Sequence, residues 1–287
     1  MKIGLSLLTE HRYGWSQLRD AAMSVEDVGF DSLWVPDHIE RPFDDATMSM
    51  YEAVSLLGAI AECTERVSFG AAVHNAAWRH PLHLVHMAVA LAEISGGRFV
   101  LAVGAGGRHY EYSFVDAPVD HPYSRFVEAI EIMRALLDGE TVTYEGRFWR
   151  TFEGRVAGVE DHAIPLTIAA NGRKSIDLAF RLGDEWNVVD LSGTPDASML
   201  ADRITSADAA AMSSGREIAR SVDLLVSPVP MPVMPEVPVI TGSPGEMIEA
   251  LGRFAEAGFD AVNCYGPSPA EVGATAWQQI VDAVHAL

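Results

Sequence analysis

Short apolar segments alternate with longer amphipathic segments along almost the whole chain. The short segments have the length and composition of buried strands. Eight of them are predicted to be strands: Ile3–Leu8, Ser32–Val35, Val67–Val73, Phe99–Val103, Pro165–Ala169, Glu185–Val189, Ala219–Val226 and Ala261–Cys264. Because helix-period segments separate the strands, the order predicts a parallel sheet.

The longer segments repeat apolar residues three and four positions apart, which is the spacing of one buried helix face. In one of them, for example, Phe126 and Ile130 fall on a single stripe. Helices are expected at Ser16–Val28, Tyr51–Cys63, Pro81–Ser95, Ser124–Leu137 and Arg173–Leu182, with a last one around Trp277. Thr194-Pro195, Ser243-Pro244 and Ser268-Pro269 indicate further helix starts, because Ser or Thr caps free amides and Pro suits the first helical position.

Eight strand and helix units predict an α/β fold, a (β/α)₈ TIM barrel formed as one domain over residues 1–287. The length suits this fold, which typically takes about 250 residues. An open, doubly wound sheet is the structural alternative, because closure is inferred only from the number of strands.

Three stretches interrupt the alternation. Gly104–Pro122 follows the fourth strand and the proline-rich Ser227–Thr241 follows the seventh, so both are expected to cap the active face. Gly139–Ile164 precedes the fifth strand and is expected near the opposite rim. It contains a predicted hairpin, Thr141–Trp149, with Glu145-Gly146 at its turn.

The chain is acidic, with 20 Lys and Arg against 40 Asp and Glu and a formal net charge of −20. This argues against binding to nucleic acid or to an anionic membrane, both of which require basic surfaces. No apolar run approaches the roughly 18 residues of a membrane span, and the run at Ile3–Leu8 is too short for a secretory signal. Cys63 and Cys264 form no C-x-x-C motif and are expected to be reduced thiols, so a cytoplasmic protein is predicted.

The segment after the fifth strand is the clearest candidate for binding a ligand. Small residues at Ala169–Gly172 let the backbone approach a ligand, and the following helix presents free amides at its start. Arg173 and Lys174 add positive charge in an otherwise acidic chain, which suits a phosphate group. The alternative is an ordinary turn with solvated charges.

Two other strand ends carry candidate chemistry. Asp37-His38 places a carboxylate beside an imidazole, which could contact a cofactor or move a proton near neutral pH. Gly104–Gly107 could form a backbone floor for a flat ring, but it is not a G-x-G-x-x-G dinucleotide motif. The alternatives are an aspartate cap with a solvated histidine, and a tight turn.

Histidines at 74, 80, 83 and 86 raise the question of a metal site. The last three are spaced for one helix face, but no carboxylate completes a compact set, and no metal is expected. The sequence also contains no G-x-S-x-G nucleophile elbow and no Walker motif.

Taken in order, these strand-end residues resemble the luciferase-like monooxygenase superfamily. The strongest matches are the runs Gly29–His38, Cys63–Gly70, Arg79–Pro81 and, most specific of all, Ser95–Gly106. Looser matches are Arg125-Phe126, Glu145-Gly146, Ala169–Gly172 and Gly242-Ser243-Pro244 with Glu246. The resemblance covers nearly the whole chain.

Members of this superfamily are barrels that bind FMN or the deazaflavin coenzyme F420, and the deazaflavin branch is the more similar one. The resemblance implies that Asp37 and His38 meet the cofactor ring, with His38 as the catalytic residue. It implies a non-prolyl cis peptide at Ala72-Val73 behind the ring, with Asn75 as a polar contact. The remaining contacts it implies are Ala105 and Gly106 at the ring or chain, and Ala169, Ala170, Asn171, Gly172 and Arg173 at the phosphate.

The function implied is an oxidoreductase that transfers hydride between coenzyme F420 and a small organic substrate, acting as a homodimer. One alternative is an FMNH₂-dependent monooxygenase served by a separate reductase. Another is a non-catalytic binding protein on a degenerate barrel. Gly107 stands where some deazaflavin dehydrogenases carry an acidic residue, which argues against a sugar-phosphate substrate. His11, Tyr13, Trp78, His109 and Tyr110 either line the substrate pocket or pack at the rim.

Overall fold

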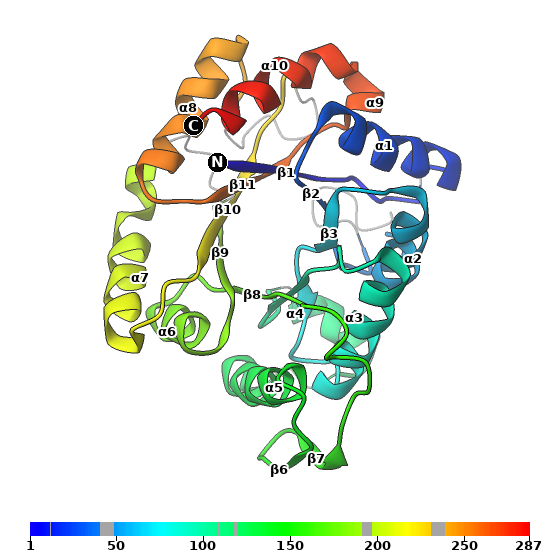
Figure 1. Cartoon of the computed structure of the whole chain (residues 1–287), viewed down its shortest axis with the longest axis vertical. Coiled ribbons are helices and arrows are strands. Elements are labelled where there is room, and N and C mark those ends of the chain that lie inside the picture. Colours follow the sequence, from blue (N-terminus) through cyan, green and yellow to red (C-terminus); the bar gives the residue numbers. More distant parts are fainter. Residues whose placement is uncertain (12, 41–48, 108, 118–119, 191–196, 231–238) are drawn as a thin grey trace.

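One parallel sheet runs through the protein and curves into a barrel (Figure 1). The computed structural model describes residues 1–287 except 12, 41–48, 108, 118–119, 191–196 and 231–238. The strands are β1 Lys2–Ser6, β2 Ser32–Val35, β3 Ser68–Ala71, β4 His74–Asn75, β5 Leu101–Gly104, β8 Leu166–Ala169, β9 Glu185–Asp190, β10 Ala219–Leu225 and β11 Ala261–Tyr265. In space their order is β3-β2-β1-β11-β10-β9-β8-β5-β4.

The two ends of this order meet, so the barrel closes. Of the predicted third strand, Val67–Val73, the structure keeps Ser68–Ala71 as β3, which pairs with β2. The short β4, at His74–Asn75, lies just beyond the predicted end and pairs with β5. Beside β3, the Phe69 amide donates to the Arg98 carbonyl at 3.1 Å and the Val100 amide donates to the Phe69 carbonyl at 2.9 Å. The predicted eight-stranded barrel is therefore confirmed, and the open-sheet alternative is excluded.

Helices surround the barrel (Figure 1). They are α1 Trp15–Val28, α2 Ala53–Cys63, α3 Pro81–Ser95, α4 His109–Phe114, α5 Pro122–Leu137, α6 Arg173–Leu182, α7 Ala201–Ser214, α8 Pro244–Glu256, α9 Pro269–Val272 and α10 Ala274–His285, with a 3₁₀ turn at Ala197–Leu200. The predicted starts at Ser243-Pro244 and Ser268-Pro269 are confirmed, whereas Thr194-Pro195 lies outside the described residues. No helix in the described part of the chain is long and apolar enough to cross a membrane.

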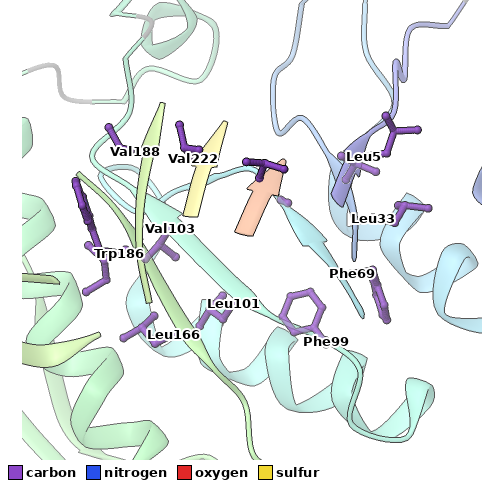
Figure 2. Close-up of a cluster of buried hydrophobic side chains, with 14 of the residues drawn as sticks. Leu5, Leu33, Phe69, Phe99, Leu101, Val103, Leu166, Trp186, Val188 and Val222 are labelled. Atoms are coloured by element: carbon purple, nitrogen blue, oxygen red, sulfur yellow. The ribbon is translucent and has the colours of Figure 1, made fainter. Parts of the chain in front are cut away.

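The large apolar core lies between the strands and the surrounding helices. Figure 2 shows side chains from successive strands, among them Leu5, Leu33, Leu101 and Val188, gathered in this cluster. Because side chains alternate along a strand, the intervening residues face the barrel interior. The apolar residues that predicted the strands are therefore those on the outer face of the barrel wall, which the helices cover.

The barrel interior is polar, whereas bulky branched residues usually fill such barrels. The indole Nε1 of Trp34 on β2 donates to Asn263 Oδ1 on β11 at 3.0 Å and to Ser32 Oγ at 2.9 Å. The bond to Asn263 crosses β1 at Gly4, where an added Cβ would lie 2.6 Å from Asn263 Oδ1 and 2.9 Å from the indole nitrogen. A glycine is therefore required for this bond.

The insertion before β8 differs from its prediction. It contains a hairpin of β6 Val142–Glu145 and β7 Arg150–Gly154, whose turn is closed by a 2.9 Å bond from the Gly146 amide to the Trp149 carbonyl. The predicted hairpin, Thr141–Trp149, was therefore wrong in its second strand, which begins only at residue 150.

The predicted location of that insertion was also wrong for the hairpin tip. The Trp149 indole donates to the Arg125 carbonyl at 2.9 Å, and His80 lies 3.1 Å from the Arg150 carbonyl. Both partners belong to the starts of helices that follow strands, so the hairpin tip lies toward the active face. The hairpin itself lies on the outside of α5 (Figure 1). Aromatic packing against α5 overrides the location expected from chain order.

Arg98 joins the ends of two helices to the barrel wall at the closure. Its guanidinium donates to the carbonyls of Ala61 at 2.7 Å, Thr64 at 2.9 Å and Val67 at 3.0 Å, and to the Thr64 hydroxyl at 2.8 Å. Its Nε donates to the Ser95 carbonyl at 2.9 Å. The Ser95–Gly106 motif therefore contains a structural residue, Arg98.

We predict that Arg98→Met lowers the free energy of unfolding by about 3 kcal/mol, because several carbonyls lose a charged donor. Urea denaturation measures the loss. Arg66→Met is the matched control, since the Arg66 side chain is 66% exposed, and it should change stability by less than about 0.5 kcal/mol. Equal losses in the two variants would contradict the role given to Arg98.

Candidate active site

A cavity of about 590 Å³ opens at the carboxyl ends of the strands. Eleven of the residues predicted to bind a cofactor line it: Asp37, His38, Ala72, Val73, Asn75, Ala105, Gly106, Ala169, Ala170, Asn171 and Gly172. Arg173, the twelfth, is the first residue of α6 and is not among the described lining residues. The fold thus brings together residues from four strand ends, while their roles in binding stay predictions.

Glycines keep one wall of this cavity flat. A Cβ at Gly104 would lie 2.7 Å from Val73 Cγ2, and a Cβ at Gly106 would collide with the side chains of Asn75 and Tyr112. Gly106 also has φ +74°, a conformation that side chains disfavour. The peptide between Ala72 and Val73 is cis, as the resemblance implied.

Asp37 is a buried anchor for the loop after β2. Arg79 binds both of its oxygens, at 2.5 and 2.7 Å, and His74 Nδ1 lies 2.9 Å from Oδ2. Burial alone would raise the pKa of Asp37, but the hydrogen bonds and charges of His74 and Arg79 outweigh it and lower the pKa to about 2. The ionised carboxylate therefore holds the strand end from which His38 extends, and its contact with a cofactor ring stays a prediction.

His38 is paired with a carboxylate that the sequence analysis missed. Glu111, on α4 and only 3% exposed, places Oε2 3.0 Å from His38 Nδ1 and accepts the Ile39 amide on Oε1 at 2.9 Å. Burial disfavours its charge, but the bonds from His38 and from the backbone lower the pKa of Glu111. Because an ionised carboxylate only accepts, Nδ1 carries the proton and Nε2 is left for a ligand.

The opposite end of the cavity is built around the start of α6. The Trp186 indole donates to the Ala170 carbonyl at 2.8 Å, and the Tyr123 hydroxyl donates to the Lys174 carbonyl at 3.1 Å. These bonds hold the turn that leads into the helix, whose first amides have no acceptor within the helix. A phosphate would suit this end.

Several lining residues had no predicted role. They are Pro36, Glu111, Tyr123, Phe126, Ser175, Val189 and Tyr265, whereas Gly104 and Gly107, which also line the cavity, belong to the stretch predicted as a backbone floor. Tyr265 ends the last strand, and this position was its only signal in the sequence. Glu111 lies seven residues beyond the end of β5, so its approach to His38 depends on how the insertion folds back.

A second cavity of about 580 Å³ adjoins the first and shares Asp37 and His38 with it. Its other lining residues are Ile39, Ser49, Met50, Glu52, Ala53, Trp78, Arg79, Val115 and Ala117. Among the residues suggested for a substrate pocket, Trp78 lies here, whereas the His11 ring stacks on Tyr51 at 4.2 Å. The side chains of His109 and Tyr110 lie outside the described residues.

Two of the histidines that raised the question of a metal have other partners. His74 contacts Asp37, and His80 lies against the Arg150 carbonyl. Among the residues that the structure describes, no three His, Cys, Asp or Glu side chains come together as metal ligands.

We predict that Asp37→Asn lowers the free energy of unfolding at pH 7 by about 1–3 kcal/mol, because Arg79 and His74 lose a charged partner. The folded pKa of Asp37 is below its ordinary value of 3.8. Its contribution is therefore present above pH 4 and is lost as the pH falls toward 2. Urea denaturation at several pH values tests this.

The matched control for that experiment is Asp20→Asn, since the Asp20 side chain is 60% exposed. It should change stability by less than about 0.5 kcal/mol. If the free energies of unfolding of wild type and Asp37→Asn differ as much at pH 2–3 as at pH 7, the ionised Asp37 carboxylate is not the source of the difference.

Comparison with known proteins supports a common ancestry for this barrel. The sequence profile of the luciferase-like monooxygenase family matches residues 1–231. The chain is 32% identical over 184 residues to the 5,10-methylenetetrahydromethanopterin reductase of Archaeoglobus fulgidus, covering 64% of this chain and 52% of that protein. It is 29% identical over 207 residues to the F420-dependent hydroxymycolic acid dehydrogenase of Mycobacterium tuberculosis, covering 71% and 57%. The matches thus span about half the length of these relatives.

Solved structures share the whole fold. An F420-dependent secondary alcohol dehydrogenase in complex with an F420-acetone adduct superposes with a TM-score of 0.84 at 23% identity, covering 99% of this chain and 98% of the other. The oxygenating constituent of 3,6-diketocamphane monooxygenase from Pseudomonas putida, in complex with FMN, gives 0.76 at 16% identity, covering 99% and 98%. At such identities the likeness establishes the fold.

Proposed function

The chain belongs to the luciferase-like monooxygenase family, and from this premise we propose that it transfers hydride between coenzyme F420 and a small organic substrate. The observation that carries the proposal is the cavity of about 590 Å³ at the carboxyl ends of the strands. It combines a flat wall, a histidine paired with a carboxylate, and a helix start suited to a phosphate. The relatives that depend on coenzyme F420 support the choice of cofactor.

The residues present fit such a cofactor. A flat ring needs a wall without side chains. Gly104 and Gly106 line the cavity and contribute none, and a Cβ at either position would collide with Val73 or with Asn75 and Tyr112. Val73 and Ala72 lie beside these glycines and would back the ring. Ala169–Gly172 would accept the phosphate at the start of α6, with Arg173 adding charge nearby.

His38 and Glu111 are proposed to move the proton that accompanies hydride transfer. When bound, coenzyme F420 supplies the carbon that accepts or releases hydride. In the direction of oxidation, His38 Nε2 would accept the proton of a substrate hydroxyl, while Glu111 holds the ring at Nδ1 and stabilises its charge. In the direction of reduction the same nitrogen would return the proton.

The second cavity supports an uncharged, partly apolar substrate. Ile39, Met50 and Val115 give it apolar walls, and Glu52 adds a carboxylate. The positive charge of Arg79 is neutralised by Asp37. A small neutral alcohol or ketone that reaches His38 through this cavity fits these walls better than a phosphate ester.

A homodimer in the cytoplasm is proposed on family resemblance alone. The FMN-dependent monooxygenase remains the second candidate, because structural neighbours with FMN share the fold. That function would require reduced FMN from a separate reductase.

Titration of the purified protein with coenzyme F420, and with oxidised and reduced FMN, separates these functions. We predict that coenzyme F420 binds in the micromolar range or tighter. Quenching of the coenzyme's fluorescence measures this binding. Tight binding of FMN alone would replace the proposal with the monooxygenase. Binding of neither would favour a non-catalytic barrel.

Replacement of His38 tests the proton-transfer role. With coenzyme F420 and a panel of uncharged secondary alcohols, His38→Gln should lower kcat by about 10²–10⁴-fold while changing cofactor affinity only a few-fold. Glu111→Gln should lower kcat less and shift the pH profile, because the imidazole keeps a weaker partner. Glucose 6-phosphate serves as the charged comparison and should be a poor substrate. Unchanged turnover in His38→Gln would refute the role.

A further inference from the structure

Below the floor of the cavity, the polar barrel interior holds a buried carboxylate. Asp223 on β10 is 1% exposed and lies between Asn187 on β9 and Asn263 on β11, which are 3% and 4% exposed. Both amides donate to the same oxygen, Oδ1, at 2.8 and 2.9 Å. The second oxygen, Oδ2, is therefore the one available to a further partner.

That partner is Tyr265, at the end of β11. Its hydroxyl lies 3.2 Å from the carbonyl oxygen of Ala72 and 3.5 Å from Asp223 Oδ2. Tyr265 and Ala72 both line the cavity, so the hydroxyl links the buried acid to the cavity floor. A hydroxyl has one proton and can donate to only one of these two acceptors at a time.

The charge of Asp223 decides which acceptor is the stronger. Burial raises the pKa of Asp223 to about 6, and the bonds from Asn263, Asn187 and Tyr265 offset only part of that effect. Among the described residues, Glu185 on β9, Cys264 on β11 and Tyr265 itself are titratable groups near it, and burial and repulsion from Asp223 raise their pKa values. Lys2 on β1 and Asp260 before β11 act on Glu185.

We propose that Asp223 and Tyr265 are positioning residues in which protonation of Asp223 directs the Tyr265 hydroxyl to the Ala72 carbonyl and so holds the floor of the cofactor site. With Asp223 ionised, the carboxylate is the better acceptor, and the hydroxyl turns away from Ala72. With Asp223 protonated, the proton lies on Oδ2, because Oδ1 already accepts two amides. Oδ2 then donates to the Tyr265 oxygen, and the hydroxyl donates to Ala72.

The proposal rests on the proposed function only for the identity of the ligand above the floor. It predicts that cofactor affinity falls as the pH rises through about 6. The loss of one neutral hydrogen bond at the floor should weaken binding about threefold to tenfold. Ionisation of the ligand itself is common to all variants, so affinities are compared with wild type at each pH.

Two substitutions distinguish the protonated state of Asp223 from the ionised state. Asp223→Asn keeps the acceptor for Asn187 and Asn263 and adds an amide donor toward Tyr265, so it mimics the protonated acid. Tyr265→Phe removes the hydroxyl. In titrations with coenzyme F420 from pH 5 to pH 7.5, Asp223→Asn should match wild type at pH 5 and bind about threefold to tenfold more tightly at pH 7.5. Tyr265→Phe should be weaker than wild type at pH 5 and equal to it at pH 7.5.

A second measurement detects the change at Tyr265 without a ligand and with Asp223 unchanged. In unliganded wild type carrying ¹³C-labelled tyrosine, the Cζ signal of Tyr265, assigned by its absence in Tyr265→Phe, should shift with a midpoint near pH 6. If coenzyme F420 binds to no variant, the proposed function fails, and this signal still decides the present proposal. A Cζ signal without an inflection between pH 5 and 7.5 would overturn it, as would equal affinity ratios at both pH values.

Discussion

Closure of the barrel depends on a short stretch of the third strand, where Phe69 exchanges hydrogen bonds with Arg98 and Val100. Directly after it the chain breaks the strand at Ala72–Val73 and resumes pairing with β5 at His74. At this break Ala72 and Val73 line the cavity, and the Ala72 carbonyl accepts the Tyr265 hydroxyl. One segment therefore completes the wall and provides the floor of the site, with Arg98 holding the helix ends behind it.

Neighbouring residues divide structural and chemical tasks at this site. Asp37 is clamped by Arg79 and His74, whereas the next residue, His38, lies at both cavities and is oriented by Glu111. The Ser95–Gly106 motif shows the same division, since it contains the structural Arg98 and ends with glycines that line the cavity. A motif can therefore identify a site even where several of its residues never contact the ligand.

The sequence was sufficient to predict those strands and helices in which the spacing of apolar residues marks the buried face. Helices α3 and α6 begin and end where predicted, and every predicted strand exists, because apolar outer faces repeat regularly along them. The break between β3 and β4 has no periodic signal and was anticipated only through the resemblance. Glu111 and the Asp223–Tyr265 pair were missed because their partners come from distant segments, and because polar residues on the inner face of a strand look like solvent-exposed positions.

The central claim is that this cavity binds coenzyme F420, and a crystal structure of the protein with the coenzyme tests it most directly. The account predicts that the ring lies against Ala72 and Val73, with His38 Nε2 facing it and the phosphate at the start of α6 beside Gly172. A coenzyme bound elsewhere, or a ring that leaves this floor uncovered, would contradict the account.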